Sequence, residues 1–97
     1  MNYPILWANE AVENLENILS YISANWTERE VNKFKAKLSE QLNIISKFPN
    51  IFSASTITPR LRKAVLTKQT IIFYEFKEQV IYITYLFDSR QNPKKIK

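Results

Sequence analysis

Near the start of the chain, apolar residues recur at the three- and four-residue spacing of an amphipathic helix. They are Ala8, Ala11, Val12, Leu15, Ile18, Leu19 and Ile22, and the pattern ends near Asn25. Asn9 is the predicted N-cap, because Glu10 and Glu13 follow in the positively polarised first turn. Residues 3–7 (YPILW) are typical of a short strand, and Pro4 places that strand at a sheet edge.

A second helix is expected almost directly after the first. Residues 27–30 (TERE) have the form of a capping box, in which the Thr27 hydroxyl and the Glu30 carboxylate each accept a backbone N–H. Phe48-Pro49 ends the helix, because proline disfavours helical geometry in the residue before it. Two helices joined by so short a link fold back as an antiparallel hairpin. The apolar positions of this helix, about five turns long, are Val31, Phe34, Leu38, Leu42 and Ile45.

From Arg62 onwards the pattern changes to runs of β-branched and aromatic residues, which are typical of strands. Strands are expected at 64–66, 70–76 and 80–87, and a short turn at 77–79 joins the last two as a hairpin. Both alternating faces of these two strands are apolar, which indicates central strands with both faces partly covered. A helix pair covers only one face, so the other needs loops, the C-terminal tail or another chain.

The order strand, helix, helix and then strands predicts an α+β fold, with the antiparallel helical hairpin packed on one face of a small, largely antiparallel sheet. Residues 1–97 are expected to form a single domain. Residues 49–60 are rich in Ser and Thr, are bracketed by two prolines, and are expected to be irregular. Residues 93–97 form a basic tail.

The residue types that the chain lacks exclude several kinds of chemistry. Without cysteine there is no disulfide, thiolate nucleophile or thiolate zinc site, and without histidine there is no imidazole base or ligand. Without glycine there is no glycine-rich phosphate loop. We therefore expect no cofactor and no metal site.

The charge is unevenly distributed along the chain. Fourteen Lys and Arg against nine Asp and Glu give a net charge of +5 and a pI near 9.6. Residues 1–40 hold four basic and six acidic side chains, whereas residues 41–97 hold ten basic and three acidic ones, so the second half is expected to bind an anionic surface. The chain shows no signal-peptide pattern and no apolar run of about 20 residues, so we expect a cytoplasmic protein without membrane association.

Three cations lie around the start of the first of these strands. Arg60, Arg62 and Lys63 could bind a phosphate or an acidic partner segment, since arginine presents a planar fork of donors to such anions. The alternative is an edge strand that its charges protect from unwanted pairing. Sequence alone leaves both open.

A second polar cluster follows the last strand, at residues 88–93 (DSRQNP). It could project onto the open sheet face, or Asp88 and Asn92 could form side-chain turns while Arg90 pairs with Asp88. Glu75 and Asp88 could share general acid–base work, but neutralisation of Glu75 by Lys68 or Lys77 is the simpler interpretation.

Two further groups of side chains have simple structural interpretations. Lysines 33, 35 and 37 are expected on a solvated helix face. Core packing is expected to account for most of the prominent aromatic residues, which are Trp7, Trp26, Tyr74, Tyr82 and Tyr85.

Together these segments resemble the RelE/ParE superfamily, the toxins of type II toxin–antitoxin modules. The resemblance covers essentially the whole chain and rests on Trp7-Ala8, Phe48-Pro49, Ile72-Phe73-Tyr74 and residues 87–93 (FDSRQNP). Its most specific part is the Arg-Gln-Asn-Pro ending, which looks most like the ParE-like, plasmid-stabilisation branch. It implies a microbial-RNase-like fold and an antitoxin partner whose extended C-terminal segment wraps the toxin.

The branches of that superfamily imply different activities. RelE-like members cut messenger RNA in the ribosome with basic residues on the sheet, whereas ParE-like members are thought to poison DNA gyrase by binding. Arg62 matches one basic position of the nucleases, but two others fall on Ala64 and Ile71, and a histidine position falls on Asp88. The ParE-like branch usually carries Arg at Lys63 and Tyr at Thr70, so this chain departs there too.

We therefore predict a ParE-like toxin that acts by binding, with DNA gyrase as its target and a cognate antitoxin as its inhibitor, in a homodimer or a toxin–antitoxin hetero-oligomer. The alternative is a RelE-like, ribosome-dependent mRNA endonuclease using Arg62, Arg90 and Glu75, and a third interpretation is an inactive member that only binds an antitoxin. The expected effector or antitoxin contacts are Arg60, Arg62, Lys63, Asp88, Arg90, Lys94 and Lys95, with Lys97 as a further candidate.

Overall fold

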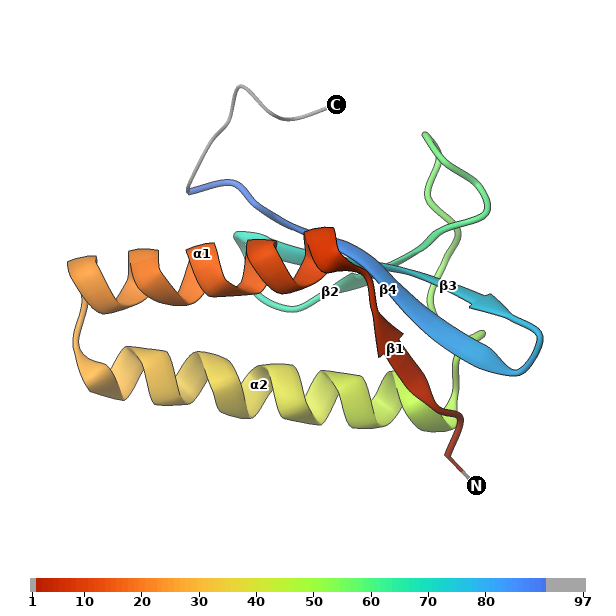
Figure 1. Ribbon diagram of the computed structural model, residues 1–97, viewed down its shortest axis with the longest axis horizontal. Coiled ribbons are helices and arrows are strands. Elements are labelled where there is room, and N and C mark those ends of the chain that lie inside the picture. The colour runs from red at the N-terminus through yellow and green to blue at the C-terminus, as the bar shows by residue number, and fades with distance from the viewer. Residues whose placement is uncertain (1, 91–97) are drawn as a thin grey trace.

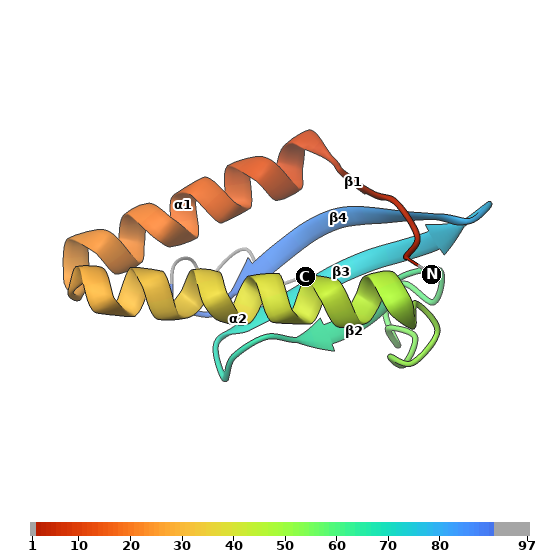
Figure 2. The ribbon, with the colours of Figure 1, turned by 90° about the horizontal axis from the view of Figure 1, so that it is seen from below.

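A four-stranded sheet in the order β1-β4-β3-β2 packs one of its faces against two helices (Figures 1 and 2). The computed structural model describes residues 2–90. Along the chain the elements are β1 (Ile5–Trp7), α1 (Asn9–Asn25), α2 (Glu28–Lys47), β2 (Arg62–Val65), β3 (Thr70–Lys77) and β4 (Val80–Asp88). Strand β1 runs parallel to β4, and the other two pairings are antiparallel. The predicted fold, the helical hairpin and the edge position of the first strand are confirmed.

The helix boundaries follow the sequence pattern, but the predicted N-cap of α1 and the side-chain bonds of the predicted capping box are wrong. Ala8, not Asn9, is the N-cap of α1, because its N–H donates to the Ile83 carbonyl (2.9 Å) and keeps its backbone extended. Thr27 is the N-cap of α2, as expected, but its side chain makes no capping bond. The Glu30 N–H donates to the backbone carbonyl of Thr27 instead (3.0 Å). Helix α2 ends at Phe48, as Pro49 predicts.

The turn between β3 and β4 is built without glycine. Glu78 and Gln79 have φ values of 53° and 67°, the left-handed conformation that a two-residue hairpin turn requires. The short turn predicted at this position is thus confirmed. Strand β2 runs from Arg62 to Val65, so it begins two residues before the predicted strand, and Leu66, the last predicted residue, lies just outside it.

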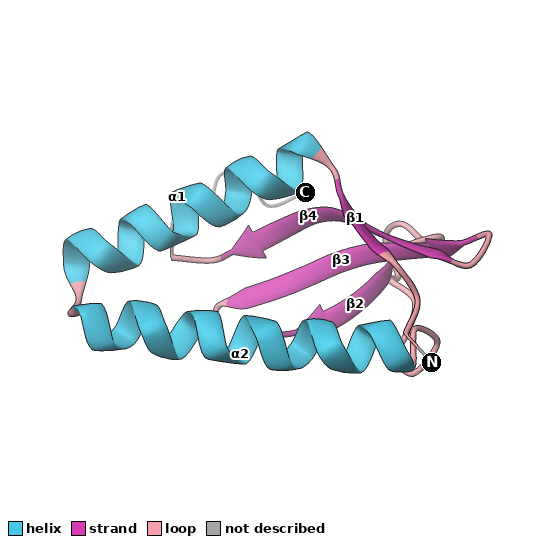
Figure 3. Cartoon of the chain, turned by 60° about the horizontal axis from the view of Figure 1, so that its bottom comes forward, coloured by secondary structure: helices cyan, strands magenta, loops and turns pink. Residues whose placement is uncertain are grey.

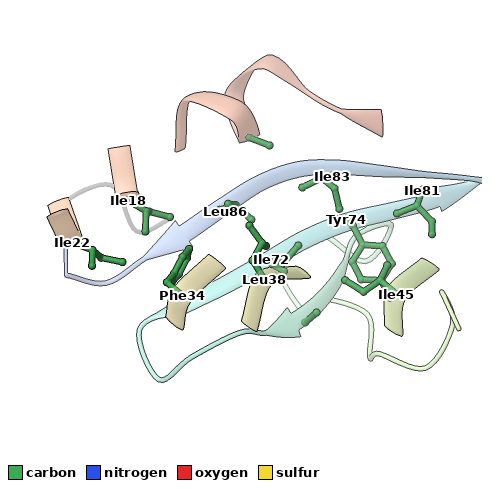
Figure 4. Close-up of a cluster of buried hydrophobic side chains, with 12 residues drawn as sticks. Ile18, Ile22, Phe34, Leu38, Ile45, Ile72, Tyr74, Ile81, Ile83 and Leu86 are labelled. Carbon is green, nitrogen blue, oxygen red and sulfur yellow. The ribbon is translucent and has the colours of Figure 1, made fainter. Parts of the chain in front are cut away.

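Every helix and each of the three longer strands contributes to one apolar core (Figure 4). The helices present residues of one face to alternate residues of the sheet. The buried cluster consists of Ala11, Ile18, Ile22, Phe34, Leu38, Ile45, Ala64, Ile72, Tyr74, Ile81, Ile83 and Leu86.

A register shift in the β3–β4 pairing decides which side chains of β4 face the helices. Ile81 and Ile83 face the core, then the pairing shifts between Phe73 and Tyr74 of β3, and Leu86 and Asp88 take up the core-facing positions. Such a bulge inserts one extra residue and changes the parity of the strand beyond it. Asp88 therefore lies on the helix side, not on the open face.

The opposite face of the sheet has no helix over it in the described part of the chain (Figure 3). By alternation it carries Leu6, Val65, Phe73, Tyr82 and Tyr85. Leu6 and Val65 are 54% and 56% exposed, and the rings of Phe73 and Tyr85 stack at 4.5 Å. The expectation that the helix pair leaves one face open is confirmed.

The outer edge of β2 is partly closed by the chain itself. The Lys63 N–H donates to the Ser53 carbonyl (3.0 Å), and the Gln41 side chain donates to the Val65 carbonyl (2.9 Å). Residues 49–60 are irregular, as expected, apart from one isolated bridge to β2. Neither helix is long and apolar enough to cross a membrane in the part of the chain described here.

Candidate functional site

Strand alternation separates the three cations around the start of β2. Arg62 pairs in register with the buried Tyr74 and so lies on the helix side, whereas Lys63 pairs with Phe73 on the open face. Arg60 is exposed in the loop before the strand. The three therefore do not form one cationic cluster.

Arg62 holds the loop that follows α2. Its guanidinium donates to the Phe52 carbonyl (2.6 Å) and, at greater length, to the Asn50 carbonyl (3.5 Å). The Tyr74 hydroxyl donates to the next carbonyl in the same loop, that of Pro49 (2.6 Å). Burial raises the pKa of Tyr74 to about 12, against a smaller opposing effect of the Arg62 charge, so this hydroxyl stays a donor. Arg62 thus stabilises the loop after α2 through its bonds to the loop carbonyls.

Asp88 is the centre of a buried hydrogen-bond network at the end of β4. The Arg90 guanidinium binds its carboxylate through two contacts, Nη2 to Oδ2 (2.6 Å) and Nε to Oδ1 (3.0 Å). The Thr70 hydroxyl donates to Oδ2 (2.7 Å), and the Arg90 backbone N–H donates to Oδ1 (2.9 Å). The geometry shows the local Asp88–Arg90 pair that was one of the two interpretations of this segment.

The network fixes the charges of both partners. Burial raises the pKa of the Asp88 carboxyl, but the hydrogen bonds from Arg90 and Thr70 outweigh this and hold that pKa below its usual 3.8. The bond to Asp88 in turn raises the pKa of Arg90. Asp88 therefore remains an anion at neutral pH, and it is a poor proton donor.

Glu75 lies far from this network. It pairs in register with Tyr82 on the open face, whereas Asp88 pairs with Thr70 on the helix side. Asp88 is the sixth residue after Tyr82, and six residues span about 20 Å along a strand. The two carboxylates cannot act as an acid–base pair. Within residues 2–90 no ion pair of Glu75 with Lys68 or Lys77 is formed, and Arg90–Asp88 is the one ion pair.

Arg90 also lies against Trp26, at the connection between the two helices. Its guanidinium carbon is 5.8 Å from the centre of the indole ring, within the range of a cation–π contact. The ring of Tyr21 lies 5.7 Å from the same indole. Trp26 is nevertheless 48% exposed, so it is an exception to the core packing expected for most of the prominent aromatic residues.

A pocket of about 390 Å³ opens beside these two side chains. Its walls come from the end of α1, the first half of α2, the β2–β3 turn and Arg90, two residues after β4. These segments meet at one end of the molecule (Figure 3). The pocket is lined by four cationic side chains, Lys33, Lys37, Lys68 and Arg90. The other lining residues are the apolar or aromatic Ile22, Trp26 and Phe34, the polar Thr67 and Gln69, and the acidic Glu30. We call this the Trp26 pocket.

Sequence reasoning missed this pocket. It placed Lys33, Lys35 and Lys37 together on a solvated face, but only Lys33 and Lys37 line the pocket. Their i,i+4 spacing around the apolar Phe34 is the signal that separates them from Lys35.

The other predicted positions are dispersed. Tyr74 is buried and Trp7 packs against the core, whereas Tyr82 is 38% exposed on the open face and is a second exception among the aromatic residues. No group of three Asp or Glu side chains gathers as a metal site between residues 2 and 90. Asn92, Lys94, Lys95 and Lys97 lie outside the described residues.

Comparison with known proteins identifies the sequence family. A family model described as ParE toxin of type II toxin-antitoxin system, parDE, matches residues 5–93. No curated protein matches the chain significantly.

Solved structures share the fold at low sequence identity. The chromosomal ParDE TA system from P. aeruginosa matches with a TM-score of 0.75 and 16% identity, covering 89% of this chain and 95% of that one. YafQ from E.coli matches with a TM-score of 0.58 and 11% identity, covering 97% and 99%. A conserved hypothetical protein from Helicobacter pylori matches with a TM-score of 0.59 and 9% identity, covering 91% and 96%.

The neighbours Arg62 and Lys63 give a matched pair for a stability test. Arg62→Ala removes a charged donor from the loop carbonyls, and we expect it to lower the free energy of unfolding by about 1.5–3 kcal/mol. Lys63→Ala removes the same charge from an exposed position, and we expect a change within about 0.5 kcal/mol. Urea denaturation followed by circular dichroism measures both. Equal losses would contradict the assignment of Arg62 to the loop.

The Asp88 network predicts a dependence of stability on pH. Because the folded-state pKa of Asp88 lies below its usual 3.8, its contribution to stability is fully present above that value and is lost as the pH falls through the folded-state pKa. Asp88→Asn removes this contribution. Between about pH 5 and about pH 2, the free energy of unfolding of the variant should fall less steeply than that of the wild type. Denaturation midpoints over this range measure the slope, and parallel profiles would contradict the network.

Proposed function

Because the chain belongs to the ParE toxin family of type II toxin–antitoxin systems, we propose that it inhibits growth by binding DNA gyrase on DNA, and that a cognate antitoxin neutralises it. The ParE-like character of the chain supports gyrase as the target, and the proposal includes a cytoplasmic site of action. The solved relative from P. aeruginosa is named as a ParDE toxin–antitoxin system, which supports a toxin–antitoxin hetero-oligomer for this chain.

The observation that carries a binding mode of action is the separation of Arg62, Arg90 and Glu75. Cleaving RNA requires a base for the 2′-hydroxyl and positive charge at the developing phosphorane, close together. Arg62 is bound to loop carbonyls, and Arg90 is bound to Asp88. The register partners of Arg62 and Asp88 on β3 are four residues apart, about 13 Å along the strand.

Glu75, the third residue of the endonuclease alternative, is separated from the two arginines by the sheet itself. Glu75 lies on the open face, on the other side of the sheet from both the Arg62 contacts and the Asp88 network. This arrangement disfavours the endonuclease alternative.

The open sheet face supports the presence of a protein partner. It presents exposed apolar side chains, Leu6 and Val65, beside the half-buried stack of Phe73 and Tyr85. The same face also carries Lys63 and Glu75. Exposed apolar side chains with polar ones among them are typical of protein interaction sites. We propose that the antitoxin covers this face.

A cleavage assay separates the candidate functions. Purified protein added to gyrase, relaxed plasmid and ATP should increase the fraction of linearised DNA recovered after detergent, because a poison traps the cleaved complex. The same protein should leave a message under translation intact in a primer-extension assay. Codon-phased cuts in that message would support the endonuclease alternative. The absence of both linearised DNA and message cleavage would support an inactive member that only binds an antitoxin.

A test of the role of Arg90 needs a variant that leaves no buried charge without its partner. Arg90→Ala alone leaves the Asp88 carboxylate without its cation, which destabilises a buried pair strongly. In Asp88→Asn/Arg90→Gln both charges disappear while amide hydrogen bonding is retained. We expect cells induced to express this variant to form at least tenfold more colonies than cells induced to express the wild type. The melting temperature of the purified variant is the control for folding. Undiminished growth inhibition would exclude Arg90 from the effector contact.

A further inference from the structure

The Trp26 pocket carries a local excess of positive charge. Lys33, Lys37 and Lys68 are exposed lysines that line it, against the single carboxylate of Glu30. Arg90 adds no net charge, because Asp88, whose side chain is only 2% exposed, neutralises it. The pocket therefore has a net charge of +2, in a volume of about 390 Å³.

The pocket also offers apolar surface next to these charges. Phe34 and Ile22 are 5% and 3% exposed and form its apolar lining, and Trp26 stands beside them with 48% of its surface exposed. Contacts with Arg90 and Tyr21 hold the indole in place. A ligand that pairs an anionic group with an adjacent apolar group would satisfy both parts of the pocket.

We propose that the Trp26 pocket binds an acidic segment of a protein partner, with a carboxylate at Lys33, Lys37 and Lys68 and a neighbouring apolar side chain against Trp26 and Phe34. The proposal goes beyond the proposed function, because it assigns the chemistry of the bound segment whichever partner supplies it. It also concerns the helix side of the sheet, away from the open apolar face.

A nucleic acid fits the same residues less well. Single strands are bound by cations that follow the backbone and by aromatic rings free to stack on bases. Here the cations surround one pocket with a carboxylate on its wall, and Arg90 and Tyr21 already contact the ring of Trp26. An acidic peptide needs neither a free ring face nor a continuous track of positive charge.

A selection experiment tests the ligand chemistry before any partner is identified. A library of random 12-residue peptides is selected on the immobilised full chain, and enriched peptides are measured by fluorescence anisotropy. We expect a class of peptides in which Asp or Glu stands beside Leu, Ile, Phe or Met. For this class, Lys33→Glu/Lys37→Glu should weaken binding at least tenfold.

The matched control reverses the same number of charges on the same helix outside the pocket. Lys35→Glu/Lys47→Glu should leave the affinity of this class within twofold of the wild type, and circular dichroism checks that both variants fold. Equal losses in the two variants, or enrichment without any acidic class that depends on Lys33 and Lys37, would overturn the proposal.

A parallel selection with random single-stranded DNA 20-mers addresses the competing class of ligand. Oligonucleotides that bind more tightly than the peptides, and lose that binding in Lys33→Glu/Lys37→Glu, would also overturn the proposal. None of these measurements uses growth or gyrase. The failure of the pocket and the failure of the proposed function are therefore distinguishable.

Discussion

The register shift between Phe73 and Tyr74 is the constraint on which the arrangement of the candidate site depends. It changes the parity of β4 and so brings Leu86 and Asp88 to the helix side of the sheet. The Leu86 N–H donates to the side chain of Asn14 on α1 (2.9 Å), beyond the point where β1 ends its pairing with β4. Without the shift, Asp88 would lie on the open face, away from Thr70, and Arg90 would have no buried anchor beside Trp26.

Most of the fold could be predicted from the spacing of apolar residues, because both helices show a clear stripe and the strands are rich in β-branched and aromatic residues. The register shift could not be predicted. Residues 80–88 (VIYITYLFD) are apolar on both faces of the strand, so nothing in their alternation marks the place where the parity changes. The sequence alone therefore does not determine on which face of the sheet Asp88 lies.

The candidate site was predictable only in part, and the reasons differ between residues. In β2 the small apolar Ala64 shares a face with Arg62, and this alternation already indicates that Arg62 and Lys63 point apart. The N-cap of α1 was misplaced because the Ala8 N–H, directly after β1, still bonds to the Ile83 carbonyl of β4 and keeps Ala8 extended. The Trp26 pocket depends on the meeting of the helical hairpin with the β2–β3 turn and with Arg90, which are distant from the hairpin in sequence. The spacing of Lys33 and Lys37 alone does not contain that meeting.

Two surfaces of different chemistry result, one with exposed apolar side chains on the open face and a cationic one on the helix side. The edges of the sheet are unequal as well. The bonds from Lys63 and Gln41 leave β2 with few backbone groups to offer, whereas β1 is only three residues long. A foreign strand that joined this sheet at either side would gain few ladder hydrogen bonds, so edge-to-edge polymerisation of the protein is disfavoured.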